Sequence, residues 1–229
     1  MKALAVVSGG LDSVTLAHLL AEENSLGGLV SFDYGQRHKK ELAFAAAAAK
    51  RLDAAHHVID ISEIAAHLKG SALTDNVDVP EGHYASENMK QTIVPNRNAI
   101  MLAVAYGIAP AYGYDAVAIA IHTGDHFIYP DCRPEFAALF DQMERKAMEG
   151  FADIKLLTPF ATKTKGDIAT EAVRLKVPVI ETWSCYKGGA VHCGRCGTCV
   201  ERREAFSVAG SADPTQYEDQ DFWKKAVNR

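Results

Sequence analysis

The sequence predicts a doubly wound α/β fold, in which helices cover both faces of a parallel sheet, with a small C-terminal four-cysteine module. Short apolar runs alternate with helical patterns along most of the chain, and four of the five cysteines fall within fifteen residues near its end. We therefore expect a main domain over residues 1–180. A cysteine module with a C-terminal helix and tail, residues 181–229, should pack with it as one unit.

Composition narrows the class of protein. Of the 229 residues, 48% are hydrophobic and 23% are charged, as in ordinary globular proteins. No run approaches the roughly 20 apolar residues of a membrane helix, and residues 1–7 lead into a glycine turn too soon for a signal peptide, which predicts a cytoplasmic protein with no membrane partner. Lys and Arg number 24 against 29 Asp and Glu. This balance favours small-molecule ligands over a stable nucleic-acid partner.

Two strand–helix units open the chain. Residues 3–7 form a short apolar run without a helical stripe, two glycines follow, and a helical pattern begins at Ser13. Residues 29–34 are a second apolar run, followed by an Ala-rich helix over residues 39–51. Residues 57–61 predict a third strand. Buried parallel strands have this continuous apolar character.

The alternation continues through the second half of the chain. We expect a helix over residues 98–109 that leads into a fourth strand over residues 115–121, and a fifth strand over residues 154–157. A helix over residues 165–175 follows. A last helix begins at Cys199, the final cysteine, and covers residues 199–206.

Two long segments interrupt this order. Residues 62–91 are polar and rich in turn residues, and residues 122–134 are irregular and aromatic. Long loops at the carboxyl ends of parallel strands usually carry ligand contacts, so we expect both segments near a binding site.

The loop Ser8-Gly9-Gly10-Leu11-Asp12-Ser13 predicts a phosphate site. Its glycines permit a turn that aims successive backbone N–H groups at one point, and the following helix adds the partial positive charge of its N-terminus. The spacing matches neither the Walker pattern nor the dinucleotide fingerprint. The alternative is a plain glycine turn with a serine helix cap.

This loop after an N-terminal strand resembles that of the PP-loop ATP pyrophosphatase superfamily. The resemblance implies an adenine nucleotide alpha hydrolase-like sheet, cleavage of ATP between its α and β phosphates, and adenylation of a substrate oxygen. It also implies that the following residues contact ATP: Val7, Ser8, Gly9, Gly10, Leu11, Asp12, Ser13, Val14, Thr15, Leu16, Ala17 and Arg37.

The cysteines at positions 185, 193, 196 and 199 predict a metal site. Four thiolates in a closed tetrahedral set are what structural zinc prefers. An iron–sulfur cluster with Cys-x-x-Cys-x-x-Cys spacing would take its next ligand downstream, whereas Cys185 lies upstream, so we favour one Zn²⁺. With no ligand position left open, the ion should hold structure and not hydrolyse a substrate.

Further segments resemble the 7-cyano-7-deazaguanine synthase family, and the resemblance runs from Leu4 to about Phe206. They are Tyr-Gly-Gln-Arg-His-x-x-Glu-Leu from Tyr34, Val-Pro-Asn-Arg-Asn from Val94, Tyr-Pro-Asp-Cys-Arg-Pro-Glu-Phe from Tyr129, Thr-Trp-Ser-Cys-Tyr from Thr182, and His-Cys-Gly-x-Cys-Gly-Thr-Cys-x-Glu-Arg from His192. The resemblance implies an ATP-dependent carbon–nitrogen ligase of queuosine biosynthesis. Such an enzyme converts 7-carboxy-7-deazaguanine and ammonia to 7-cyano-7-deazaguanine, and forms AMP and diphosphate from ATP.

Two segments depart from the family pattern. Residues 121–128 read Ile-His-Thr-Gly-Asp-His-Phe-Ile where many members resemble Val-Asn-x-x-Asp-x-Ser-Gly. Residues 163–168 read Lys-Thr-Lys-Gly-Asp-Ile, similar to the family run Leu-Thr-Lys-x-Glu-Ile, so Lys165 takes the place of the family lysine.

The resemblance assigns roles at the ATP end of the site. Lys165 and Arg97 should offset charge at the α-phosphate, and Mg²⁺ should bridge phosphate oxygens. Asp12 either stabilises the loop by capping the helix or holds the metal through water. The reaction should pass through an adenylated carboxylate, an amide and an adenylated imidate.

The base of the substrate should be read by residues of the irregular loop. The candidates are Tyr129, Asp131, Cys132 and Arg133. The run from Arg133 also fits the first turn of a helix with proline at its start, and a nucleophilic role for Cys132 is the less favoured alternative.

Two other functions remain open from the sequence. One is a PP-loop enzyme that adenylates a base within tRNA, which salt-sensitive tRNA binding would support. The other is a non-catalytic ATP- and zinc-binding module, which would release no AMP. The family resemblance also implies a homodimer.

Overall fold

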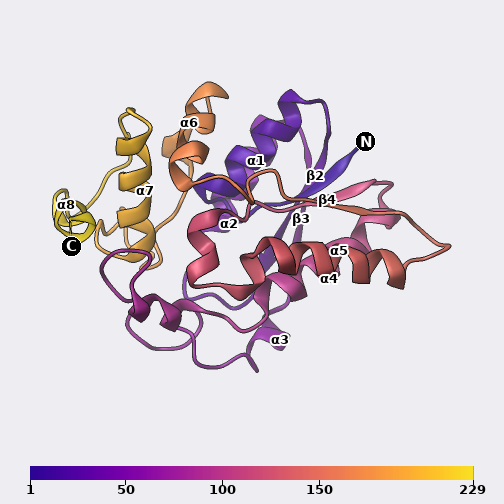
Figure 1. The fold of residues 1–229 in the computed structure, drawn as a ribbon, viewed down its shortest axis with the longest axis horizontal. Coiled ribbons are helices and arrows are strands. Elements are labelled where there is room, and N and C mark those ends of the chain that lie inside the picture. The colour runs from indigo at the N-terminus through magenta and orange to yellow at the C-terminus, as the bar shows by residue number, and fades with distance from the viewer. Residues whose placement is uncertain (229) are drawn as a thin grey trace.

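A computed structural model describes residues 1–228 and confirms the doubly wound α/β fold. Five parallel strands lie in the order β3-β2-β1-β4-β5 (Figure 1). Their bounds are β1 (Ala3–Val6), β2 (Leu26–Asp33), β3 (Ala55–Asp60), β4 (Ala116–Ala118) and β5 (Lys155–Leu157). The strand order reverses between β1 and β4, and such a switch point opens a crevice at the carboxyl ends of the strands.

Helices cover both faces of the sheet (Figure 1). The longer ones are α1 (Leu11–Glu22), α2 (Lys40–Arg51), α4 (Arg97–Ala111), α5 (Pro134–Ala147), α6 (Lys165–Arg174) and α7 (Gly197–Val208); α3 (Ser62–Ala65) and α8 (Phe222–Val227) are short. Alternate strand residues enter different cores. Leu4 packs in the core with α4 and α5, whereas Ala3 and Ala5 pack in the core with α1, α2 and α6.

Two expectations about the elements need correction. The predicted strand over residues 115–121 ends at Ala118, because beyond it the chain leaves the ladder and carries residues 119–121 into a pocket. The segment 62–91 contains α3 and most of a 3₁₀ helix, Glu87–Thr92. A further 3₁₀ helix, Thr123–Phe127, lies in the irregular aromatic segment.

The glycine turn after β1 is confined from two sides. Gly9 has a φ of +96°, and a Cβ atom there would collide with the carbonyl oxygen of Glu41 in α2. On the other side, the Gly9 carbonyl accepts a hydrogen bond from the backbone N–H of Trp183 at 2.9 Å. The loop conformation therefore depends on both α2 and the segment that leads to the cysteines.

The C-terminal module sits at one end of the sheet, where α7 and α8 lie beyond α6 (Figure 1). Arg202 of α7 is fully buried at its centre. Its guanidinium donates to Thr182 Oγ1 and Thr215 Oγ1, each at 2.8 Å, and pairs with Asp213 at 3.2 Å. The tail after α7 is thus fastened to the module. The boundary at residue 180 stays a prediction.

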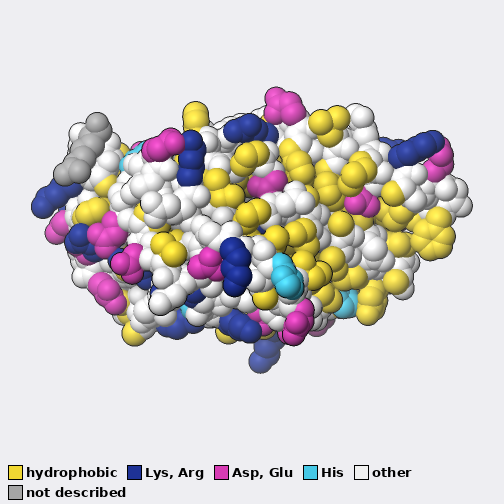
Figure 2. Space-filling view, turned by 90° about the horizontal axis from the view of Figure 1, so that it is seen from below, with side chains coloured by type: hydrophobic (Ala, Val, Ile, Leu, Met, Phe, Trp, Pro, Cys, Tyr) yellow, Lys and Arg dark blue, Asp and Glu magenta, His cyan; other side chains and the backbone are white. Residues whose placement is uncertain are grey.

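Hydrophobic side chains gather on the side of the molecule that carries α4 and α5, as Figure 2 shows. On α5, Leu139 and Met143 are exposed. None of the helices within residues 1–228 combines the length and the apolar character that a membrane crossing needs.

Candidate active site

A pocket opens at the carboxyl ends of β1 and β4, at the switch point where the strand order reverses. Its walls come from the glycine loop, α2, α4, the aromatic segment, α6 and the cysteine module. Among the residues predicted from sequence, the structure brings together here Ser8, Gly10, Leu11, Asp12, Ser13, Arg97, Tyr129, Cys132 and Lys165.

The glycine loop is held by its own serines. Ser13 Oγ accepts from Ser8 N–H at 3.2 Å and donates to the Gly10 carbonyl at 3.2 Å, and Ser8 Oγ accepts from Gly10 N–H at 3.3 Å. Gly10 is the N-cap of α1 and has no side chain to bond the first N–H groups of the helix. These N–H groups therefore stay available to an anion.

Lys165 lies at the first position of α6 and enters a group of carboxylates. Its Nζ is 2.5 Å from Asp12 Oδ2 and 3.4 Å from Glu201 Oε2 of α7. Burial lowers the pKa of Lys165, but the charges of Asp12 and Glu201 outweigh it and raise the pKa above its ordinary value. The lysine is therefore a fixed cation beside the glycine loop.

The acids around Lys165 differ in their electrostatics. Burial alone would raise the pKa of Asp12. Charged neighbours, chiefly Lys165 and His122, lower it by more than burial raises it, so the pKa lies below its usual value. Burial keeps the pKa of Glu201 raised in spite of Lys165. Asp125 accepts from Tyr84 Oη at 3.0 Å and lies 3.5 Å from His122 Nε2.

The opposite wall combines a cation with aromatic rings. The Arg97 guanidinium lies 5.5 Å from the ring centre of Tyr34 and donates to its Oη at 3.4 Å. Tyr129 and Tyr186 face the same space, with their hydroxyl oxygens 3.4 Å apart. Among residues 1–228, no carboxylate lies within 4 Å of the Arg97 guanidinium.

Nine other candidates do not line the pocket. Six of them are buried at the glycine turn or in α1: Val7, Gly9, Val14, Thr15, Leu16 and Ala17. The other three are Arg37, Asp131 and Arg133. Arg37 donates to the Val77 carbonyl at 2.6 Å, and Arg133 donates to the His126 carbonyl at 3.0 Å. Asp131 accepts from the backbone N–H of Asn98, at the start of α4, at 2.9 Å.

Cys132 lines the pocket with a buried thiol. Its Sγ accepts from Asn98 Nδ2 at 3.1 Å, and burial raises the pKa of the thiol far above its usual value. This environment opposes formation of the thiolate that a nucleophilic cysteine needs.

Several pocket residues escaped the sequence analysis. Glu41 and Glu201 lie inside segments that resemble the family, but nothing in those segments predicted that the two side chains line the pocket. His122 and Asp125 lie in the segment that departs from the family pattern, and only the fold brings them to Lys165.

The four module cysteines form one buried cluster, with all sulfur atoms within 4.8 Å of one another. A tetrahedral ion with bonds of about 2.3 Å spaces its sulfurs by about 3.8 Å, and Cys193 Sγ lies 3.9 Å from Cys199 Sγ. Backbone N–H groups of Arg195 and Cys196 point at Cys193 Sγ at 3.4 and 3.3 Å, which favours a thiolate. The donor set therefore fits a tetrahedral metal.

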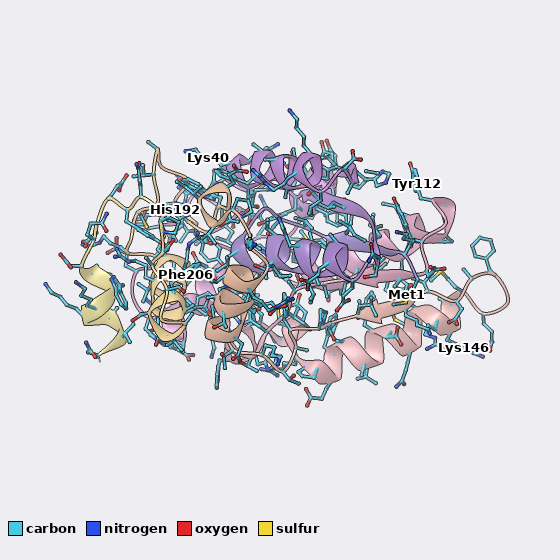
Figure 3. All side chains as sticks on the ribbon, turned by 90° about the horizontal axis from the view of Figure 1, so that it is seen from above. Met1, Lys40, Tyr112, Lys146, His192 and Phe206 are labelled. Carbon is cyan, nitrogen blue, oxygen red and sulfur yellow. The ribbon has the colours of Figure 1, made fainter. Side chains whose placement is uncertain are left out.

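Aromatic contacts join the module to α2. Lys40 Nζ lies 4.6 Å from the ring centre of Trp183 and donates to the Gly189 carbonyl. The His192 ring is tilted by 37° against the Trp183 ring, with the ring centres 4.3 Å apart. Figure 3 shows Lys40 and His192 at this end of the molecule. His192 Nε2 accepts from Ser184 N–H at 3.1 Å, and burial lowers the pKa of this histidine to about 4.

Known proteins resemble this chain over nearly its whole length. The family described as "Queuosine biosynthesis protein QueC" matches residues 2–210. The chain is 64% identical over 229 residues to "7-cyano-7-deazaguanine synthase" of Rhizobium johnstonii, which covers 100% of this chain and 97% of that protein. The equivalent protein of Allorhizobium ampelinum is 65% identical over 228 residues, with the same coverage.

A solved structure shares the fold. NMN synthetase from Francisella tularensis superposes with a TM-score of 0.50 at 13% identity, over 99% of this chain and 82% of that one.

Proposed function

This chain belongs to the 7-cyano-7-deazaguanine synthase family, the ATP-dependent ligases of queuosine biosynthesis, and we propose that the pocket at β1 and β4 performs this ligation on 7-carboxy-7-deazaguanine, ammonia and ATP. One observation carries the proposal. A backbone phosphate loop with a fixed lysine shares one pocket with Arg97, a cation that pairs with no carboxylate among residues 1–228. Such a pocket can hold a nucleotide beside a carboxylate substrate.

The ATP end is formed by the glycine loop. The Ser8–Ser13 loop would bind the β and γ phosphates through its N–H groups, and Lys165 would offset negative charge at the α-phosphate. Asp12 Oδ1 is buried and lacks a hydrogen-bond partner among the described residues. That oxygen would hold a water of the Mg²⁺ ion that accompanies ATP.

The base end is formed by the tyrosine wall. Arg97 would bind the substrate carboxylate and keep it directed at the α-phosphate, while Tyr129 and Cys132 would contact the ring system. Asp131 and Arg133 would support this wall from behind, since both bond to neighbouring backbone groups. Arg37 would hold the loop after β2.

The chemistry needs two activations, because a carboxylate cannot expel oxide. The carboxylate oxygen would attack the α-phosphorus of ATP and release diphosphate, and ammonia would then displace AMP to give the amide. The amide oxygen would attack a second ATP, and loss of AMP from the adenylated imidate would leave the nitrile. The chain contributes alignment and charge stabilisation.

The module would bind one structural Zn²⁺ through Cys185, Cys193, Cys196 and Cys199. The ion would hold the ends of the module together and take no part in the reaction. Cysteines that form no disulfide suit the reducing conditions of the cytoplasm, where we place the protein.

A second copy of the chain would cover α4. From Asn98 to Ala111 this helix has no charged side chain, and Ala103, Gly107 and Ala111 form an exposed row of small residues. Half-buried Val104 and Ile108 border the row. Small residues four apart permit two helices to approach closely, so we propose a homodimer through this face.

The test is an assay of the purified protein with 7-carboxy-7-deazaguanine, ammonium, Mg²⁺ and ATP. The expected result is the nitrile base together with two AMP per nitrile. Persistent amide would limit the chain to the first activation, and ADP in place of AMP would contradict adenylation. A lack of turnover with salt-sensitive tRNA binding would favour a tRNA-modifying relative instead.

A further inference from the structure

The pocket contains four carboxylates, one from each of four segments of the chain: Asp12, Glu41, Asp125 and Glu201. Three of them already have strong partners. Lys165 pairs with Asp12 and Glu201, and Tyr84 donates to Asp125. Glu41, in the first turn of α2, has no cation within 4 Å among residues 1–228, so it is the carboxylate left available to a ligand.

Glu41 is nevertheless held in position. Its Oε1 accepts from Gln36 Nε2 at 3.4 Å. The Gln36 amide is itself fixed, because its oxygen accepts from Tyr34 N–H at 2.8 Å and its nitrogen also donates to the Phe32 carbonyl at 3.4 Å. One carboxylate oxygen is therefore oriented, and the Glu41 backbone packs against Gly9 of the phosphate loop.

The surroundings suit exchange of a proton near neutral pH. Burial raises the pKa of Glu41 to about 7, although the charge of Arg97 and the hydrogen bond from Gln36 both lower it. Tyr34, whose pKa responds to the charge of Glu41, has its pKa raised by burial to about 12 and stays neutral. A base whose pKa lies near the working pH is effective in proton transfer.

We propose that Glu41 is the proton acceptor for the nitrogen of the substrate, a catalytic residue beyond the phosphate loop and Lys165. This inference rests on the proposed function, which needs such a group. Ammonia brings three N–H protons, and none of them remains in a nitrile.

The protons leave one at a time. When ammonia forms the C–N bond and the C–O bond to AMP breaks, the nitrogen loses its first proton. It loses the second when the amide oxygen forms its bond to the α-phosphorus and diphosphate departs. The third leaves as the C–O bond of the imidate breaks with its electrons on AMP, and the electron pair of the N–H bond completes the triple bond. Glu41 would take each proton and return it to solvent before the next.

The test compares two steps in Glu41→Gln. Carboxylate-dependent exchange of labelled diphosphate into ATP reports adenylation without ammonia and removes no N–H proton. We expect exchange within about twofold of the unmodified protein, and formation of amide and nitrile lowered about 100-fold. Glu63→Gln, which removes an exposed carboxylate from α3, is the matched control and should change neither rate.

The pH profile provides the second readout. Because the carboxylate must be deprotonated to accept a proton, nitrile formation at a fixed concentration of free ammonia should rise through pH 7, and Glu41→Gln should lose this rise. Equal loss of exchange and ligation in the variant would make Glu41 a positioning residue and overturn the proposal, as would an unchanged ligation rate. Absence of exchange in the unmodified protein would contradict the adenylation mechanism itself, and both proposals with it.

Discussion

At the residue scale, Lys165 shows how a short capping motif can aim a charge. Thr164 Oγ1 accepts from Asp167 N–H at 3.1 Å, and Asp167 accepts from Thr164 N–H at 2.8 Å, a reciprocal cap that fixes the start of α6. The helix start places the ammonium of Lys165 beside Asp12, which is 153 residues away in the chain. Only the fold can reveal that ion pair.

Removal of this ammonium should mainly slow adenylation. We expect Lys165→Ala to lower diphosphate exchange by about 100-fold or more, since loss of one group aimed at developing charge has an effect of that size. Lys163→Ala, an exposed neighbour, is the control. Circular dichroism should show both variants folded, and a folded Lys165→Ala with full exchange would remove the lysine from the mechanism.

At the scale of elements, regular periodicity was predictable and the pocket segments were not. Local patterns predicted the helix over residues 39–51 and the strand over residues 3–7. In the structure the helix starts one residue later, and the strand ends one residue earlier. By contrast, the turns around His122 form because its Nδ1 accepts from Gly124 N–H while its Nε2 faces Asp125. Such side-chain contacts leave no periodic signal. The body of α5 beyond its proline start was likewise not predicted.

The clearest element to test is the cysteine cluster. Cys196→Ser should remove the bound zinc and lower the melting temperature, because metal-binding free energy contributes to folding in modules of this kind. Cys132→Ser makes the same chemical change at a buried cysteine outside the cluster and should keep the metal. Metal analysis and thermal unfolding check both, and unchanged metal and melting in Cys196→Ser would refute the zinc assignment.

At the scale of the whole molecule, the outer face of α4 differs from the surfaces of α5 and α6. Charged pairs lie on those two helices, such as Arg145 with Asp141, 3.9 Å apart, and Arg174 with Glu22, 2.5 Å apart. The outer face of α4 has only apolar and small side chains. This contrast supports a second copy at α4.

A single charge should separate the copies. A Cβ atom at Gly107 meets nothing within 4 Å, so Gly107→Glu should leave the monomer folded and even favour the helix by up to about 1 kcal/mol. If α4 forms the dimer contact, the added charge should separate the two copies. Sedimentation equilibrium should then give the mass of a single chain. Ala46→Glu, at an exposed site of α2, is the control and should stay dimeric. A Gly107→Glu dimer would exclude this face.

The buried Arg202 also sets an order of events during synthesis. All five strands precede residue 158, so the sheet can assemble before the module is made. Among residues 1–228, Asp213 is the only carboxylate that pairs with the Arg202 guanidinium, and Thr215 supplies one of its hydroxyl acceptors. Until those residues have left the ribosome, the Arg202 guanidinium cannot be buried with its carboxylate partner, so we expect the module beside the glycine loop to fold last.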